Sequence, residues 1–159
     1  MRLYHFTGLR ALIGDAGLAV IQPGGVDIRT VAAPGSIIAD GLKPYKEDSY
    51  DHLLRSPLPP CVWLTSDPDT GLIRVMGNPF SSHVGFRVTV LIPSINRRLA
   101  HWPKYFRKHG WLTLSEALQL ANVPEAVRRA NTTFYVYFGT ITRITAVSRL
   151  DELEDSDAG

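Results

Sequence analysis

The stretch Leu3-Tyr4-His5-Phe6-Thr7-Gly8, close to the start of the chain, decides the fold. Residues 3–6 are apolar or aromatic, as in a short β-strand, and Thr7 belongs to the residue types that cap helices at their start. The apolar positions that follow at helical spacing are Leu9, Leu12, Ile13 and Ala16. Gly17 then stands where a left-handed helix cap is expected. This order predicts a strand followed directly by a helix of about two turns.

Further strand patterns recur along the chain. In one run every second residue is apolar, namely Phe86, Val88, Val90 and Ile92. This alternation predicts a strand with one buried face. Val62-Trp63-Leu64-Thr65 is a compact strand candidate, and residues 26–31 allow a short strand. Two β-rich runs near the end of the chain, residues 134–138 and 141–147, are joined at Gly139 and indicate a terminal strand pair.

Helical patterns lie between these strands. The stretches that carry them are residues 36–41, 95–108 and 115–129. The last stretch is expected to begin at a cap formed by Thr113 or Ser115 and to break at Pro124. Residues 45–60 are polar and then proline-rich, which predicts a long surface loop that is able to lie over a ligand.

Length and composition indicate one globular domain. The chain has 159 residues, of which 45% are hydrophobic and 20% are charged, as in ordinary folded proteins. We expect an α+β domain over residues 1–150, with a mainly antiparallel sheet and flanking helices. Residues 151–159 are acidic and are expected to form a disordered tail.

The chain has no feature of a membrane or secreted protein. No apolar run reaches the roughly 18 residues of a transmembrane helix, and the first residues do not form a secretory signal. The cytoplasm is therefore the expected compartment. Cys61 is the only cysteine, so an internal disulfide is excluded, and between apolar neighbours we expect it to be a small buried side chain.

Basic residues gather in one segment although the net charge is only +2. Within thirteen residues the sequence places Arg97, Arg98, Lys104, Arg107, Lys108 and His109. Such a cluster is able to bind phosphates, nucleic acid or an acidic protein. A solvated helix face is the commoner meaning of such a cluster, and both interpretations remain open at this stage.

Two strand segments carry candidate binding residues. His5 and Thr7 are two positions apart, so an imidazole and a hydroxyl point to the same side of a strand. Trp63 and Thr65 repeat this spacing with an aromatic ring, onto which a nicotinamide or a base can stack. The alternatives are that His5 is a hydrogen-bonded core histidine and that Trp63 is an ordinary core residue.

Several other classes of site are excluded by motif. The chain has no paired histidine or cysteine spacing that suits zinc, so no metal site is expected. It also lacks the GxGxxG, GxxxxGK(S/T) and GxSxG motifs. Dehydrogenase, P-loop and α/β-hydrolase functions are therefore excluded.

These segments together resemble a known family. The order Leu-Tyr-His-Phe-Thr, short helix, Gly-Leu, loop, Val-Trp-Leu-Thr-Ser, strand, helices and terminal strand pair is similar to small bacterial and phage proteins of the ADP-ribosyltransferase superfamily. Members include DarT-type DNA-modifying toxins and RNA 2′-phosphotransferases. The resemblance implies a split antiparallel sheet that holds NAD, as a substrate, between its two halves.

The resemblance also implies roles for individual residues. His5 would bond the nicotinamide ribose, Thr7 or the backbone beside it would hold the nicotinamide amide, and Trp63 would pack on the nicotinamide ring. The whole set implied to bind NAD is Tyr4, His5, Phe6, Thr7, Trp63 and Thr65.

The chain departs from the family at the strand that should carry a catalytic acid. Many members have a glutamate there, whereas Asn131-Thr132-Thr133-Phe134 has none, and Thr133 is the nearest polar equivalent. The catalytic candidates are thus His5 and Thr133, with Glu116, Glu125 and Asp67 as unselected substitutes for the acid. Two functions remain: transfer of ADP-ribose from NAD to a nucleic acid or protein, or a catalytically silent nucleotide-binding or inhibitory module.

Overall fold

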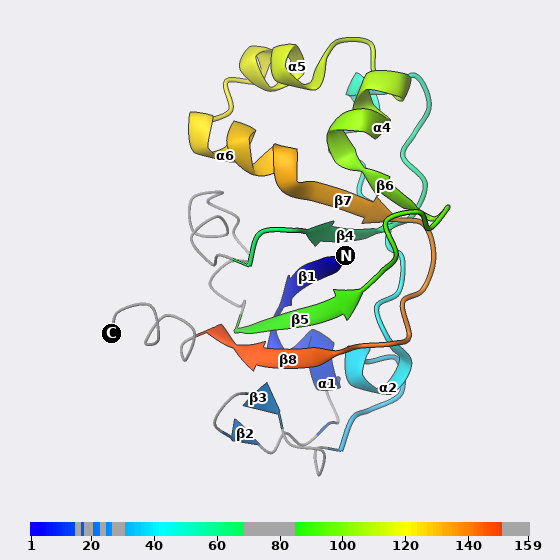
Figure 1. Ribbon diagram of the computed structural model, residues 1–159, viewed down its shortest axis with the longest axis vertical. Helices are drawn as coiled ribbons and strands as arrows, with labels where there is room; N and C mark the ends of the chain where they lie inside the picture. The colour runs from blue at the N-terminus through cyan, green and yellow to red at the C-terminus, as the bar shows by residue number, and fades with distance from the viewer. Residues whose placement is uncertain (15–16, 18–20, 23–24, 27–30, 69–84, 151–159) are drawn as a thin grey trace.

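Six antiparallel strands build the main sheet of the computed structural model, which describes residues 1–14, 17, 21–22, 25–26, 31–68 and 85–150 (Figure 1). The strands are β1 (Arg2–Thr7), β4 (Val62–Thr65), β5 (Phe86–Leu91), β6 (Leu99–His101), β7 (Phe134–Tyr137) and β8 (Ala146–Arg149). They lie in the order β6-β7-β4-β1-β5-β8. A separate antiparallel pair is formed by the short strands β2 (Ile21–Gln22) and β3 (Gly25–Val26).

Short helices accompany the sheet. They are α1 (Leu9–Ile13), α2 (Ile37–Asp40), α4 (Trp102–His109), α5 (Leu114–Leu120) and α6 (Glu125–Ala130), with 3-10 turns at Asp51–Leu53 and Asn131–Thr133. In Figure 1, α1 and α2 lie near β8 and α4 to α6 lie at the opposite end of the molecule. The expected α+β class, a mainly antiparallel sheet with flanking helices, is confirmed. Within the described ranges no helix is long and apolar enough to cross a membrane.

The sheet consists of two well-paired halves that meet at a thin junction. β1 pairs with β5 along its whole length, from Arg2↔Leu91 to Thr7↔Phe86. β4 pairs with β7 along its whole length as well. Between β1 and β4, in contrast, the register has a single pair, Tyr4↔Thr65. The β1-β5-β8 half and the β6-β7-β4 half are therefore joined at one point of the main-chain ladder.

Two clusters of buried side chains cover the two faces of the sheet. We call the cluster around Leu3, Val88 and Val90, with Leu12, Ile13 and Ile37 from the first two helices, the first core. We call the cluster around Val136, Trp102, Phe106, Leu54 and Leu58, with Trp63 packed against it, the second core. Because side chains alternate along a strand, Val62 and Leu64 of β4 enter the first core while Trp63, between them, enters the second. The two cores thus lie on opposite faces.

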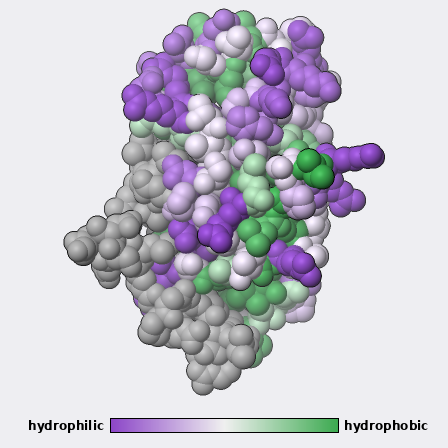
Figure 2. All heavy atoms as spheres, in the orientation of Figure 1, coloured by the Kyte–Doolittle hydropathy of each residue, from purple (hydrophilic) through white to green (hydrophobic). Residues whose placement is uncertain are grey.

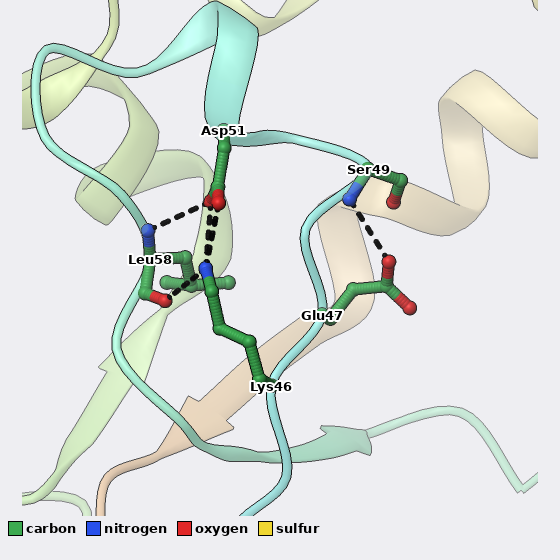
Figure 3. A network of polar contacts seen from close by, with 5 residues as sticks. All are labelled: Lys46, Glu47, Ser49, Asp51 and Leu58. Carbon is green, nitrogen blue, oxygen red and sulfur yellow. Dashed lines mark hydrogen bonds and ion pairs between the residues drawn. The ribbon is translucent and has the colours of Figure 1, made fainter.

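The segment of residues 45–60, expected as a long surface loop, is fastened to the second core. Leu54 and Leu58 are buried there, and Tyr45 pairs with Cys61. In Figure 3, the ammonium of Lys46 lies 2.9 and 2.7 Å from the two carboxylate oxygens of Asp51 and 2.7 Å from the carbonyl oxygen of Leu58. The Leu58 amide also donates to Asp51 Oδ1 at 2.9 Å. One carboxylate therefore closes this loop on itself.

Several predicted elements are confirmed with small changes. The β4 strand has the predicted bounds, and the helical stretch over 115–129 divides into α5 and α6 at Pro124. Thr113 caps α5, since its Oγ1 accepts from the Glu116 amide at 3.1 Å. α2 ends at Gly41, whose φ of 87° favours glycine.

Other predictions for the first half of the chain were wrong. Thr7 does not cap the first helix, because its main chain pairs with Phe86 as the last residue of β1, and Gly8 precedes α1 instead. The helix also ends at Gly14 with φ 83°, before Gly17. The strand expected over residues 26–31 stays a prediction, because residues 27–30 lie outside the described part of the chain and only Val26 belongs to a described strand.

In the second half of the chain, residues 95–108 do not form one helix. They contain strand β6, which pairs with β7, and α4 begins only at Trp102. The expected terminal strand pair is not formed either, because β7 pairs with β4 and β6 while β8 pairs with β5 at the other edge of the sheet. The acidic tail over residues 151–159 lies outside the described residues.

The loop closed by Asp51 gives a first testable prediction. The hydrogen bond from Lys46, and then that from the Leu58 amide, lower the pKa of the Asp51 carboxyl. A lowered folded-state pKa adds stability above the unfolded value of about 3.9, and this stability is lost as pH falls through the folded-state pKa. We expect Asp51→Asn to melt at a lower temperature than wild type at pH 7, with the difference closing below about pH 4.

Thermal denaturation followed by circular dichroism checks this expectation. Asp48→Asn is the matched control, because Asp48 is exposed three residues earlier and its carboxylate makes no ion pair among the described residues. It should melt like wild type at both pH values. Equal melting temperatures for wild type and Asp51→Asn at pH 7 would contradict the prediction.

Candidate functional site

His5 lies at the junction between the two halves of the sheet. Its main chain pairs with Val88 of β5, and its Nδ1 lies 2.9 Å from the carbonyl oxygen of Trp63 on β4. A carbonyl oxygen only accepts hydrogen bonds, so Nδ1 must carry the proton that is donated. The imidazole therefore ties the halves together on the side of Tyr4↔Thr65 where the main-chain ladder of β1 and β4 ends.

The same contact fixes the chemical form of His5. Burial lowers the pKa of the imidazole, and the hydrogen bond to Trp63 opposes this only in part. At neutral pH the ring is thus uncharged, with its proton on Nδ1 and a lone pair on Nε2. His5 remains partly exposed as a residue. It can accordingly accept a hydrogen bond from a ligand hydroxyl.

Thr65, at the end of β4, and Thr133, in the 3-10 turn before β7, form a second polar contact. Their hydroxyl oxygens are 2.9 Å apart, and Thr133 Oγ1 also donates to the carbonyl oxygen of Ala130 at 2.8 Å. Since Thr133 has one hydroxyl proton, Thr65 must be the donor between the two hydroxyls. The Asp67 amide in turn donates to Thr65 Oγ1 at 3.1 Å. The result is a directed chain of hydrogen bonds that ends at Ala130.

This chain of hydrogen bonds bears on the expected catalytic role of Thr133. Its proton is already donated to a main-chain carbonyl, and its own carbonyl oxygen accepts from the Ser66 amide at 3.0 Å. A hydroxyl held in this way orients its neighbours and does not act as a base. The structure thus suits Thr133 as a positioning residue, and its catalytic role stays a prediction.

The aromatic residues of the candidate site lie mostly in the second core. The ring of Trp63 is 4.8 Å from that of Trp102, 5.6 Å from that of Tyr50 and 6.2 Å from that of Phe134, measured between ring centres. Its indole Nε1 is buried and has no hydrogen-bond partner among the described residues. This placement is also what the alternative interpretation, that Trp63 is an ordinary core residue, predicts.

The predicted site residues divide between two faces of the sheet. By the register, His5 and Thr7 point to the face of the first core, whereas Tyr4, Trp63 and Thr65 point to the face of the second. The remaining residue of the set, Phe6, shares the face of Tyr4. The structure therefore brings the two groups together only at the β1–β4 junction, where His5 reaches the Trp63 carbonyl.

The acidic candidates are placed unequally. Glu125 forms ion pairs with Arg128 and Arg129 on the surface of α6, and Glu116 lies exposed on α5. Asp67 lies two residues after the end of β4, and its amide donates to Thr65 in the chain of hydrogen bonds described above. Of the three, Asp67 is the one attached to the candidate site.

Sequence reasoning missed Arg87, which belongs to the same region. Its guanidinium lies 4.8 Å from the ring centre of Tyr4, and its Nη1 donates to the carbonyl oxygen of Pro68 at 3.2 Å. The signal was present, because Arg87 is the one charged residue inside the apolar run of β5. Strand alternation alone assigned it to a solvent-facing position.

Metal and thiol chemistry find no support in the described residues. No group of three or more histidine, cysteine, aspartate or glutamate side chains among them is arranged to hold a metal ion. Burial raises the pKa of the Cys61 thiol to about 11, so it is protonated at neutral pH and is a poor nucleophile. The expectation of a small buried side chain is confirmed for Cys61.

The basic segment lies away from the junction, on the turn before β6 and on α4. Its exposed members are Arg97, Arg98, Lys104, Arg107 and Lys108. None of them forms an ion pair with a described carboxylate. Nearby, the guanidinium of Arg55 lies 5.4 Å from the ring centre of the exposed Trp111. Figure 2 shows hydrophilic side chains over much of this end of the molecule.

Neither a known protein family, nor a curated protein, nor a solved structure matches this chain. Its chemistry must therefore be inferred from its own residues. Those at the β1–β4 junction offer a neutral imidazole with a free lone pair, a hydroxyl chain, aromatic rings and a guanidinium. These groups suit binding and orientation of a ligand that has hydroxyl, ring and anionic parts.

The neutral state of His5 gives a second prediction, on stability. An unfolded histidine takes up a proton near pH 6.5, which the folded state resists, so stability is lost as pH falls below about 6.5. We expect the free energy of unfolding of wild type to decrease between pH 7 and pH 5 more than that of His5→Asn. Asparagine retains a donor for the Trp63 carbonyl but does not titrate.

Urea denaturation at both pH values measures the difference. His52→Asn is the matched control, because His52 is exposed and its loss should leave the wild-type pH dependence unchanged. If His5→Asn loses as much stability as wild type between pH 7 and pH 5, His5 is not held in its neutral form.

Proposed function

We propose that this chain is a mono-ADP-ribosyltransferase-like enzyme, which transfers ADP-ribose from NAD to a macromolecular acceptor. The observation that carries the proposal is the junction of β1 and β4, where two halves of a sheet meet at one main-chain pair and His5 bridges them. A split antiparallel sheet is the arrangement that the resemblance of the sequence implies for this superfamily.

The protonation state of His5 supports this chemistry. Cleavage of the bond between nicotinamide and ribose develops positive charge on the ribose, and a protonated imidazole beside it would oppose that charge. Burial keeps His5 neutral, and the Trp63 carbonyl keeps its proton on Nδ1. Nε2 is then free to accept a hydrogen bond from a ribose hydroxyl and to orient the sugar.

The remaining members of the proposed NAD site lie on both faces of the sheet near this point. Thr7 follows His5 on the same strand face, and Tyr4, Phe6, Trp63 and Thr65 line the opposite face. In the proposal, Thr7 or the backbone beside it holds the nicotinamide amide, and Trp63 supplies an aromatic surface. Thr65 is held by Thr133, so its contribution is to fix the end of β4.

A second candidate function, binding without transfer, is favoured by one observation. The turn Asn131–Thr133 carries no carboxylate, and the Thr133 proton is donated to Ala130. A nucleotide bound at the junction would then have no base from this turn to activate an acceptor. In that case the chain is a nucleotide-binding or inhibitory module of the same fold.

For the acceptor, the basic segment supports a nucleic acid. Its cations on α4 and the preceding turn lack carboxylate partners among the described residues, which leaves them available to phosphates. The exposed Trp111 beside Arg55 adds a ring on which an unpaired base can stack. A protein acceptor with an acidic surface is the alternative.

The third prediction tests the NAD site. We expect purified protein to bind NAD in calorimetry. It should also release nicotinamide from NAD when single-stranded DNA, RNA or a cell extract is added as the source of the acceptor. His5→Ala should abolish release, because the ribose loses its orienting acceptor, while His52→Ala should retain wild-type activity. Full activity of His5→Ala would exclude the proposed site, and NAD binding without release would favour the silent module.

The fourth prediction tests the acceptor surface. We expect the triple variant Lys104→Gln, Arg107→Gln, Lys108→Gln to bind a fluorescent single-stranded oligonucleotide more weakly than wild type in anisotropy titrations. The slope of log affinity against log salt should become shallower by about 0.7 for each phosphate that the variant no longer neutralises. Arg143→Gln, at an exposed position of the other half, controls for loss of charge alone. A wild-type affinity that ignores salt would exclude nucleic acid.

A further inference from the structure

His101 is a partly exposed imidazole at the end of β6, directly before α4. Its Nε2 lies 2.7 Å from the carbonyl oxygen of Thr132. A carbonyl oxygen only accepts hydrogen bonds, so Nε2 carries the donated proton, and in the uncharged ring Nδ1 keeps a lone pair. The ring also lies 4.9 Å from that of Tyr135, measured between ring centres. Two contacts thus orient the imidazole, while its Nδ1 makes no hydrogen bond within the described residues.

The strand register places this imidazole on the face of the sheet to which His5 points. His101 pairs with Tyr135 of β7, and Tyr135 pairs in turn with Leu64 of β4. Leu64 enters the first core together with Leu3, which lies two residues before His5 on β1. Because paired residues share a face and side chains alternate along each strand, His5 and His101 project from the same side of the sheet.

His101 is hydrogen-bonded to the turn that should carry the catalytic acid. The resemblance of the sequence implies an acid at Asn131–Thr133, and the chain has none there. The Thr133 proton is donated to Ala130, and no carboxylate is hydrogen-bonded to this turn among the described residues. The proton-accepting side chain beside the turn is therefore an imidazole from the neighbouring strand β6.

The spacing of the two imidazoles fits a reacting ribose and an attacking group between them. β7 and β4 separate β6 from β1, so three strand spacings of about 4.8 Å place the main chains of β6 and β1 about 14 Å apart. A base comes within about 3 Å of the group it deprotonates, and that group within about 3 Å of the atom it attacks. A sugar bonded to His5 Nε2 fills the rest of this distance.

Cations of the basic segment stand on both sides of His101 along the chain. Arg97 and Arg98 precede β6, and Lys104 follows in the first turn of α4. Their side chains are exposed and form no ion pair with a described carboxylate. A polyanionic acceptor bound by these cations is thereby led past His101.

We infer that His101 is the general base that activates the acceptor, an inference that deepens the proposed function and rests on it. The Nδ1 lone pair takes the proton from a hydroxyl or N–H group of the acceptor as the acceptor atom bonds to the anomeric carbon of the ribose. The bond from that carbon to nicotinamide breaks, and its electron pair leaves with the nicotinamide nitrogen, which becomes neutral. The imidazolium then releases the proton to water.

Two substitutions separate a base from a residue that only holds the turn. Asparagine in His101→Asn still donates to the Thr132 carbonyl but cannot take up the proton. We expect it to lower kcat for nicotinamide release by about 100- to 10,000-fold, with single-stranded DNA, RNA or water as the acceptor, and to leave the KM for NAD unchanged. His101→Ala should lose as much activity and regain part of it when imidazole is added to the solution.

His52→Ala, at an exposed histidine outside the site, is the matched control and should keep the wild-type kcat with or without imidazole. Calorimetry with NAD shows whether each variant is folded, because His101 does not contact NAD in the proposal. Full kcat in His101→Asn would contradict the inference. So would a loss in His101→Ala that asparagine restores and imidazole does not, since His101 would then be a positioning residue.

The inference and the proposed function fail in different ways. If wild type releases no nicotinamide with any of these acceptors, the proposed transfer falls and the role of His101 falls with it. If wild type releases nicotinamide and His101→Asn does so at the same kcat, the transfer reaction stands and its base is another group.

Discussion

The single main-chain pair between β1 and β4 is the constraint on which the rest of the structure depends. The two cores lie on opposite faces of the sheet, and the main-chain link between the strands at its centre is short. Here the first core covers one face of β1 and β5, and the second covers the other face of β4 and β7. β4 serves both, since Val62 and Leu64 enter one core and Trp63 packs against the other. At the junction, a side-chain hydrogen bond from His5 to the Trp63 carbonyl adds to the single main-chain pair that joins β1 and β4.

One contact of His5 serves both the stability of the sheet and the proposed binding site. Donation to the Trp63 carbonyl closes the junction and satisfies a nitrogen that burial would otherwise leave unpaired. The same bond determines which ring nitrogen keeps a lone pair, while burial removes the charge. Nε2 takes no part in this contact and keeps its lone pair.

The sequence predicted those elements whose pattern depends on local burial. β4 was recognised as an apolar run of four residues and β5 by its alternation. Elements that depend on distant partners were missed: β6 is a strand only because β7 offers an edge, and Thr7 extends β1 instead of capping α1 because Phe86 pairs with it. At the candidate site, His5 and Trp63 were predicted from residue type and stay predictions. Arg87 was not, since its lack of a carboxylate partner among the described residues is a property of the folded chain.

The absence of a carboxylate before β7 follows from the local structure. α6 is separated from this strand only by the 3-10 turn Asn131–Thr133, and the carbonyl oxygens of its last turn need donors. Asn131 Nδ2 donates to the Val127 carbonyl at 2.8 Å, and Thr133 Oγ1 donates to that of Ala130. A glutamate at either position has no proton to offer and would set its charge against the negative end of the helix. Any acid that takes part in transfer must therefore come from another segment, of which Asp67 is the one already joined to the threonine chain, or from the acceptor itself.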